Sequence, residues 1–173
     1  MNSAESYRRW FNYEIDVHQK TIASLEAVTD DLRNLPAYQK AVDLFAHIIS
    51  ARRLWLFRFG IAEEPITDIF PQNVDVRSLA ALAEAMQTIW ANYLAGVDDA
   101  ELARVFEYQA LDGKRFKNTI EDILTQLFGH SWYHRGQIAQ LLRSLGAEPA
   151  VTDFVYWCRE AIADSPVPKE IPV

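Results

Sequence analysis

The sequence predicts an all-α protein, an antiparallel four-helix bundle with a short β-hairpin-like excursion before the fourth helix. Two observations lead to this fold class. Glycine and proline divide the 173-residue chain into long segments in which apolar residues recur every three or four positions. The chain is also the size of one domain, at 19.8 kDa, and is apolar enough to bury one sizeable core. Four long helices with short or modest connections pack most simply as such a bundle.

The first three helices are expected over residues 3–31, 36–60 and 78–96. The second begins at a proline, which suits a first helical turn, and ends at a glycine. It is apolar almost all round, as expected of a helix buried in a bundle. Residues 61–75 contain two prolines and are expected to form a connecting loop.

The fourth helix has the clearest boundaries. Asn118 and Glu121 resemble a capping box, and Gly146 ends the helical pattern. Before it, residues 105–116 are rich in β-forming side chains around an Asp-Gly pair, which predicts the hairpin.

A short fifth helix is expected over residues 151–163. Residues 1–163 are therefore expected to form a single domain. Residues 164–173 contain three of the seven prolines and are expected to be an extended or frayed tail.

Composition excludes several classes of function. The chain has 17 Lys and Arg against 24 Asp and Glu, and its formal charge is −7, so nucleic acid is not expected as a partner. No apolar run approaches the ~18 residues that span a membrane, and residues 1–10 lack the apolar core of a signal peptide. Cys158 is the single cysteine; it fits a reducing compartment and is expected to be a small buried hydrophobe. We expect a cytoplasmic protein that has no membrane partner.

Polar residues interrupt the inner stripe of the fourth helix. His130, His134 and Gln137 stand where apolar side chains are expected, and burying them costs about 1–3 kcal/mol each unless they find partners. Imidazoles four residues apart on a helix point the same way and can reach one metal ion. An isolated pair at this spacing also arises by chance or from ordinary hydrogen bonding in a core.

A third ligand would come from one of the two other histidines. His47 lies in the apolar second helix, with Asp43 one turn before it, so it is expected to be buried and Asp43 to accept its spare N–H. The alternative is a core histidine satisfied by Asp43 or a backbone carbonyl. His18 is followed by Gln19 and Lys20 and is expected to face solvent. His47 is therefore the better candidate.

Two segments carry a resemblance to a known family. Residues 44–55 (LFAHIISARRLW) and 127–138 (LFGHSWYHRGQI) resemble the second and fourth helices of the DinB superfamily, whose hallmark is a His-x-x-x-His-Arg-Gly-Gln run. The resemblance implies a four-helix bundle, frequently dimeric, with three histidines that hold a divalent metal. By position these are His47, His130 and His134. Some relatives are transferases or isomerases that use a low-molecular-weight thiol, and many have no established activity.

These observations predict a divalent-metal enzyme of the DinB-like type, acting by metal-activated water or thiol, as a hydrolase or a thiol-dependent transferase. Zinc and nickel both suit imidazole ligands. The expected substrate is a small molecule, with a low-molecular-weight thiol as one candidate, and no catalytic residue is identified. The alternatives are a non-catalytic bundle whose metal has a structural or sensing role, and a metal-free interaction module. A homodimer is expected, formed through the first helix with Trp10, Phe11 and Tyr13.

The sequence also suggests roles for several residues near these histidines. Gln137 is expected to contact either a metal-bound water or substrate, or a backbone group. Arg135 is expected to pair with an acidic group on another helix or across the dimer interface. Gly136 is expected to allow a close helix approach. Three aromatic residues either border a pocket beside the metal or belong to the core: Trp55, Trp132 and Tyr133.

Overall fold

The computed structural model describes residues 3–161, which are mostly helical and include one two-stranded antiparallel sheet. This agrees with the predicted all-α class. The predicted tail, residues 164–173, lies outside the described residues. In chain order the elements are α1 (Ser3–Glu26), α2 (Asp30–Arg33), α3 (Pro36–Arg58), η1 (Val76–Ser78), α4 (Leu79–Gly96), α5 (Asp99–Ala103), β1 (Val105–Gln109), β2 (Arg115–Thr119), α6 (Ile120–Ser144) and α7 (Phe154–Cys158).

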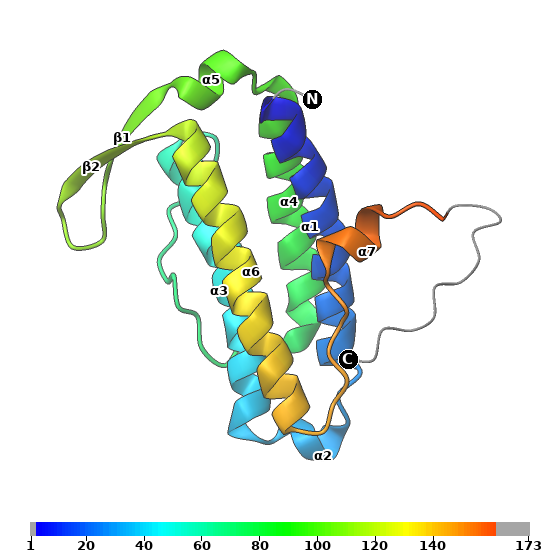
Figure 1. Ribbon diagram of the computed structural model, residues 1–173. Coiled ribbons are helices and arrows are strands. Elements are labelled where there is room, and N and C mark those ends of the chain that lie inside the picture. The colour runs from blue at the N-terminus through cyan, green and yellow to red at the C-terminus, as the bar shows by residue number, and fades with distance from the viewer. Residues whose placement is uncertain (1–2, 162–173) are drawn as a thin grey trace.

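Four long helices, α1, α3, α4 and α6, lie side by side (Figure 1). The colours of Figure 1 show that α1 and α6 run in one direction and α3 and α4 in the other. The principal contacts are those of α3 with α6 and of α1 with α4, and α3 also packs on α4. Neighbouring α3 and α4 can run the same way because residues 59–75 return along the length of α3 before η1 begins.

The interior between these helices is filled by large apolar side chains. Phe45 on α3, Trp90 on α4 and Phe128 on α6 are fully buried, each at most 2% exposed. Burying such a ring stabilises the fold by about 1.5–3 kcal/mol. This packing fixes α3 against α6, the two helices that carry the predicted metal ligands.

The start of α6 lies one residue later than predicted. Thr119, not Asn118, is the N-cap: its hydroxyl accepts the N–H of Asp122 at 3.1 Å, and the Asp122 carboxylate accepts the N–H of Thr119 at 3.1 Å. Asn118 belongs to β2, where it pairs with Phe106. The reciprocal cap therefore forms where the strand ends, because both orphan N–H groups are satisfied there.

The smaller elements partly follow the prediction. The hairpin forms, with Val105 opposite Thr119 and a turn at Gly113, whose φ of 83° suits glycine. Helix α5 was not predicted. Helix α7 is shorter than the predicted fifth helix, and Cys158 at its end is half-buried rather than buried, so that prediction is wrong. Among the described residues, no helix is long and apolar enough to span a membrane.

Candidate metal centre

Three histidines converge between α3 and α6. His47 comes from α3, and His130 and His134 come from successive turns of α6. One ring nitrogen from each lies within 4.8 Å of the others, and the ring centroids are 4.4 to 4.9 Å apart. The three side chains that were predicted to be ligands are thus brought together, and the group could hold a metal ion.

His47 is oriented by the loop after α3. Its Nδ1–H donates to the carbonyl oxygen of Ile69 at 2.6 Å, and its ring stacks on Phe70, with centroids 4.5 Å apart. A neutral imidazole that donates from Nδ1 carries its lone pair on Nε2. That Nε2 lies 3.0 Å from Nε2 of His130. His47 is therefore held in the tautomer and direction that a metal ligand needs.

Asp43 does not accept the N–H of His47, so that prediction is wrong. The Asp43 carboxylate instead accepts the backbone N–H groups of Asn73 and Val74, at 3.2 and 3.0 Å, and the side-chain N–H of Gln39 at 2.9 Å. Asn73 has a φ of 57°, a region in which asparagine is one of the few tolerated residues. Asp43 therefore fastens the loop whose earlier residues hold His47.

Gln137 has a partner that was not predicted. Its side-chain carbonyl accepts the Nδ1–H of His134 at 2.7 Å. A carbonyl acceptor on Nδ1 leaves the lone pair of His134 on Nε2. Two of the three imidazoles thus have their Nδ1 proton bound to an acceptor.

His130 and His134 are kept neutral by their surroundings. Burial, together with the neighbouring His134, His47 and Arg52, lowers the pKa of His130 to about 4. Burial is also the main cause of the lowered pKa of His134, against the opposing effect of Gln137. Metal ligation requires neutral imidazole, and these two rings are neutral at pH 7.

One pair of ring nitrogens already has the spacing that a divalent ion needs. Two nitrogens that each lie ~2.0–2.1 Å from zinc are at most ~4.2 Å apart, and the Nε2 atoms of His47 and His130 meet this limit at 3.0 Å. The Nδ1 of His130 is buried without a hydrogen-bond partner. Nε2 of His47 is a hydrogen-bond acceptor, so its short contact with Nε2 of His130 needs a donor on the other ring. The single ring proton of neutral His130 therefore lies on its Nε2. A cation between the rings would replace this contact.

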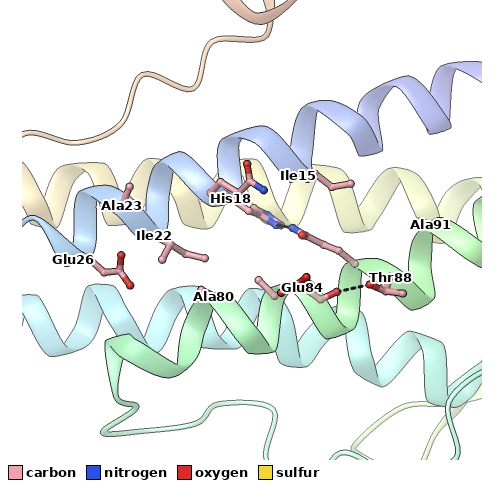
Figure 2. Close-up of a pocket in the computed structure, with 12 residues that line it drawn as sticks. Ile15, His18, Ile22, Ala23, Glu26, Ala80, Glu84, Thr88 and Ala91 are labelled. Carbon is pink, nitrogen blue, oxygen red and sulfur yellow. Dashed lines mark hydrogen bonds between the residues drawn. The ribbon is translucent and has the colours of Figure 1, made fainter.

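His18 was predicted to face solvent, and that prediction is wrong: its side chain is buried, with 1% exposed. It lies apart from the three histidines, in a cavity of about 570 Å³ between α1 and α4 (Figure 2). Gln87 donates to its Nδ1 at 3.1 Å, and burial lowers its pKa well below the ordinary value. The sequence contained the signal: His18 continues the buried stripe of Phe11 and Glu14 at helical spacing, while its exposed neighbours lie on the other face.

A buried ion cluster joins three helices beside the histidines. Glu14 of α1 pairs with Arg52 of α3 and with Arg135 of α6, the latter at 3.0 Å, and all three are at most 4% exposed. This confirms the prediction that Arg135 pairs with an acid on another helix. Glu14 itself was missed. The predicted close approach at Gly136 is wrong, because a Cβ there would meet nothing within 4 Å.

Two open cavities, each of about 500 Å³, meet at His47. The loop cavity lies under residues 70–73 and reaches His134; the hairpin cavity lies between α3, the β-hairpin and α6 and reaches His130. Trp55 lines the hairpin cavity, as one interpretation predicted. Trp132 and Tyr133 are instead 44% and 64% exposed and line neither cavity.

Comparison with known proteins adds one finding. The family model described as DinB family matches residues 1–164, which is nearly the whole chain and includes all three converging histidines. No curated protein and no solved structure matches the chain.

Proposed function

The chain belongs to the DinB family, and from that membership we propose that it is a metal-dependent enzyme whose divalent ion is bound by His47, His130 and His134. In this proposal the four long helices form the four-helix bundle of the family, and residues 1–163 are its single domain. The observation that carries it is the convergence of the three imidazoles at the meeting point of two open cavities.

The number of ligands supports a reactive rather than a closed site. Structural zinc sites are four-coordinate and closed, whereas catalytic sites keep a position for water or substrate. Among the described residues, the candidate group contains three ligands and no fourth His, Cys, Asp or Glu. Zinc or nickel suits three imidazoles.

The chemistry follows from charge. A divalent ion on neutral imidazoles keeps its full charge and lowers the pKa of a water or thiol beside it. The chain's own part is to orient the rings. The backbone carbonyl of Ile69 accepts a hydrogen bond from Nδ1–H of His47, and the side-chain carbonyl of Gln137 accepts one from Nδ1–H of His134. Phe70 covers one face of the His47 ring. Hydrolysis or thiol transfer on a small molecule, with a low-molecular-weight thiol as candidate co-substrate, is the proposed reaction class.

A structural role for the metal is less well supported. The cluster of Glu14, Arg52 and Arg135 already links α3 to α6 through α1, so these helices do not need an ion to hold them together. Elemental analysis of tag-free protein should find about one divalent ion per chain. Turnover of a thiol or hydrolysable substrate should disappear with chelator and return with metal. Metal-dependent melting without turnover would favour the structural role, and protein that binds neither zinc nor nickel would contradict both.

Assembly and location are also proposals. A homodimer is proposed from the family tendency, but Phe11 and Tyr13 cannot form its interface as expected, because both are only 3% exposed within one chain. A cytoplasmic location is proposed because the single cysteine fits a reducing compartment.

A further inference from the structure

The hairpin cavity has a reactive end and a charged end. His47 and His130 border it, and so do Trp55, Arg58 and Tyr108. Arg58 follows His47 by eleven residues on α3, which is about 16 Å along a helix axis. The volume of the hairpin cavity, about 500 Å³, lies within the range of small-molecule sites.

Arg58 has no carboxylate partner among the described residues. Its guanidinium donates to the carbonyl oxygen of Gln109 at 3.0 Å and lies over the rings of Trp55 and Tyr108, 4.7 and 5.2 Å from their centroids. A guanidinium has five N–H donors, so most of those on Arg58 have no acceptor in this group. The neighbouring Arg53, by contrast, lies 3.6 Å from Glu64.

The rest of the lining is mainly apolar. Its hydrophobic surface includes the side chains of Leu54, Ile69, Leu111 and Phe116. The one acidic side chain in the lining, Asp112, is paired with Lys114 at 2.8 Å, so its charge is balanced locally. A ligand here would bury an apolar body, and a carboxylate beside Arg58 would gain two parallel charge-assisted hydrogen bonds and the attraction of opposite charges, which a neutral acceptor does not.

We propose that the hairpin cavity binds the substrate and that this substrate is an elongated organic anion: its carboxylate bonds to Arg58, its apolar body lies along Trp55 and Tyr108, and its opposite end reaches His47 and His130. The guanidinium of Arg58 lies over the ring of Trp55, and Trp55 follows His47 by eight residues on α3. The apolar body of the ligand must therefore span about 12 Å. This inference rests on the proposed function, because the reacting end is the one at the metal ligands.

The charged end can be tested without metal. Decanoate should bind metal-free protein in a calorimetric titration, and Arg58→Met should weaken this binding at least tenfold, the value expected for loss of a hydrogen bond to a charged group. Arg58→Lys should restore part of the affinity. Arg53→Met is the matched control and should leave binding unchanged. Equal binding of decanoate to wild type and Arg58→Met, with both folded by circular dichroism, would overturn the inference.

The reactive end is tested with cobalt(II) as the metal. 8-Mercaptooctanoate should produce a thiolate-to-cobalt absorption band and should bind at least tenfold more tightly than the neutral 8-mercaptooctan-1-ol. Arg58→Met should remove this preference while the alcohol still binds. If cobalt binds and the two thiols bind equally to wild type, the inference fails and the proposed function stands. If cobalt does not bind, the proposed function fails, and decanoate still decides the charged end.

Discussion

The Nδ1–H of His47 donates to the carbonyl oxygen of Ile69 at 2.6 Å, and this bond directs the Nε2 lone pair toward His130. The two partners are 22 residues apart, on a helix and in a loop that the sequence identified only as a connection. The loop is in turn fastened by Asp43. Asp43, which was predicted to contact His47 directly, thus supports it indirectly by holding the backbone of this loop.

Replacing His134 with alanine should remove most of the bound metal, because the other two imidazoles would then have to hold the ion alone. The measurement is elemental analysis of the folded fraction. His18→Ala is the control: this histidine also projects from a long helix but lies in a separate cavity, so metal content per folded chain should not change. Full metal in His134→Ala, or its loss in His18→Ala, would disprove the ligand assignment.

Gln137→Leu should lower metal affinity by about 10- to 100-fold, the usual effect of removing the group that orients a metal-binding histidine. The lost contact is the 2.7 Å bond from Nδ1 of His134. Gln137→Glu keeps an acceptor at this position and should retain most of the affinity. Competition titration with a chromogenic chelator measures both variants. Equal weakening by the two substitutions would show that the hydrogen bond is not the cause.

Glu14→Gln should destabilise the protein by about 3–5 kcal/mol, because it leaves the buried guanidinium groups of Arg52 and Arg135 without a counter-charge. The control is Asp16→Asn, which breaks the surface pair with Lys20 and should cost less than ~1 kcal/mol. Urea unfolding followed by circular dichroism gives both values. A similar decrease in the free energy of unfolding for the two variants would show that the buried cluster contributes no more to stability than a surface ion pair.

Metal-free protein should lose stability as the pH falls from about 6.5, the unfolded pKa of histidine, toward the folded pKa of His130, about 4. In this window the unfolded chain takes up protons that the folded chain does not, so the free energy of unfolding decreases as pH falls. His18, with its pKa also lowered, acts in the same direction. His130→Gln should therefore flatten the dependence without abolishing it. Stability that rises on acidification would contradict the assignment.

Light scattering should give a mass of twice 19.8 kDa if the proposed homodimer forms. The half-buried Trp10, which packs against Phe128 and Trp132, is the one aromatic of the predicted set that is still partly accessible. A specific interface buries ~800 Å² on each partner. A mass of one chain over a wide concentration range would rule out the dimer.

The sequence by itself determined the elements whose cause is local. Helical periodicity located α1, α3, α4 and α6 to within a few residues, and the Asp-Gly pair located the hairpin turn. The spacing of His130 and His134 placed both imidazoles on one face of α6, because residues four apart on a helix share a face wherever that helix packs. The apolar surroundings of His47 made it the better candidate for the third member, and the family resemblance, confirmed by the match to residues 1–164, agreed with that choice.

Only the tertiary structure decided which groups satisfy those side chains. Ile69 holds His47, Glu14 neutralises Arg52 and Arg135, and Arg58 faces a cavity that the hairpin borders. These contacts join positions far apart in the chain, and the partner of His47 is a backbone carbonyl, a group that every residue has and no sequence pattern marks. Burial of a polar group can be read from periodicity, but its partner depends on how helices and loops pack, and that packing settles the geometry of the site.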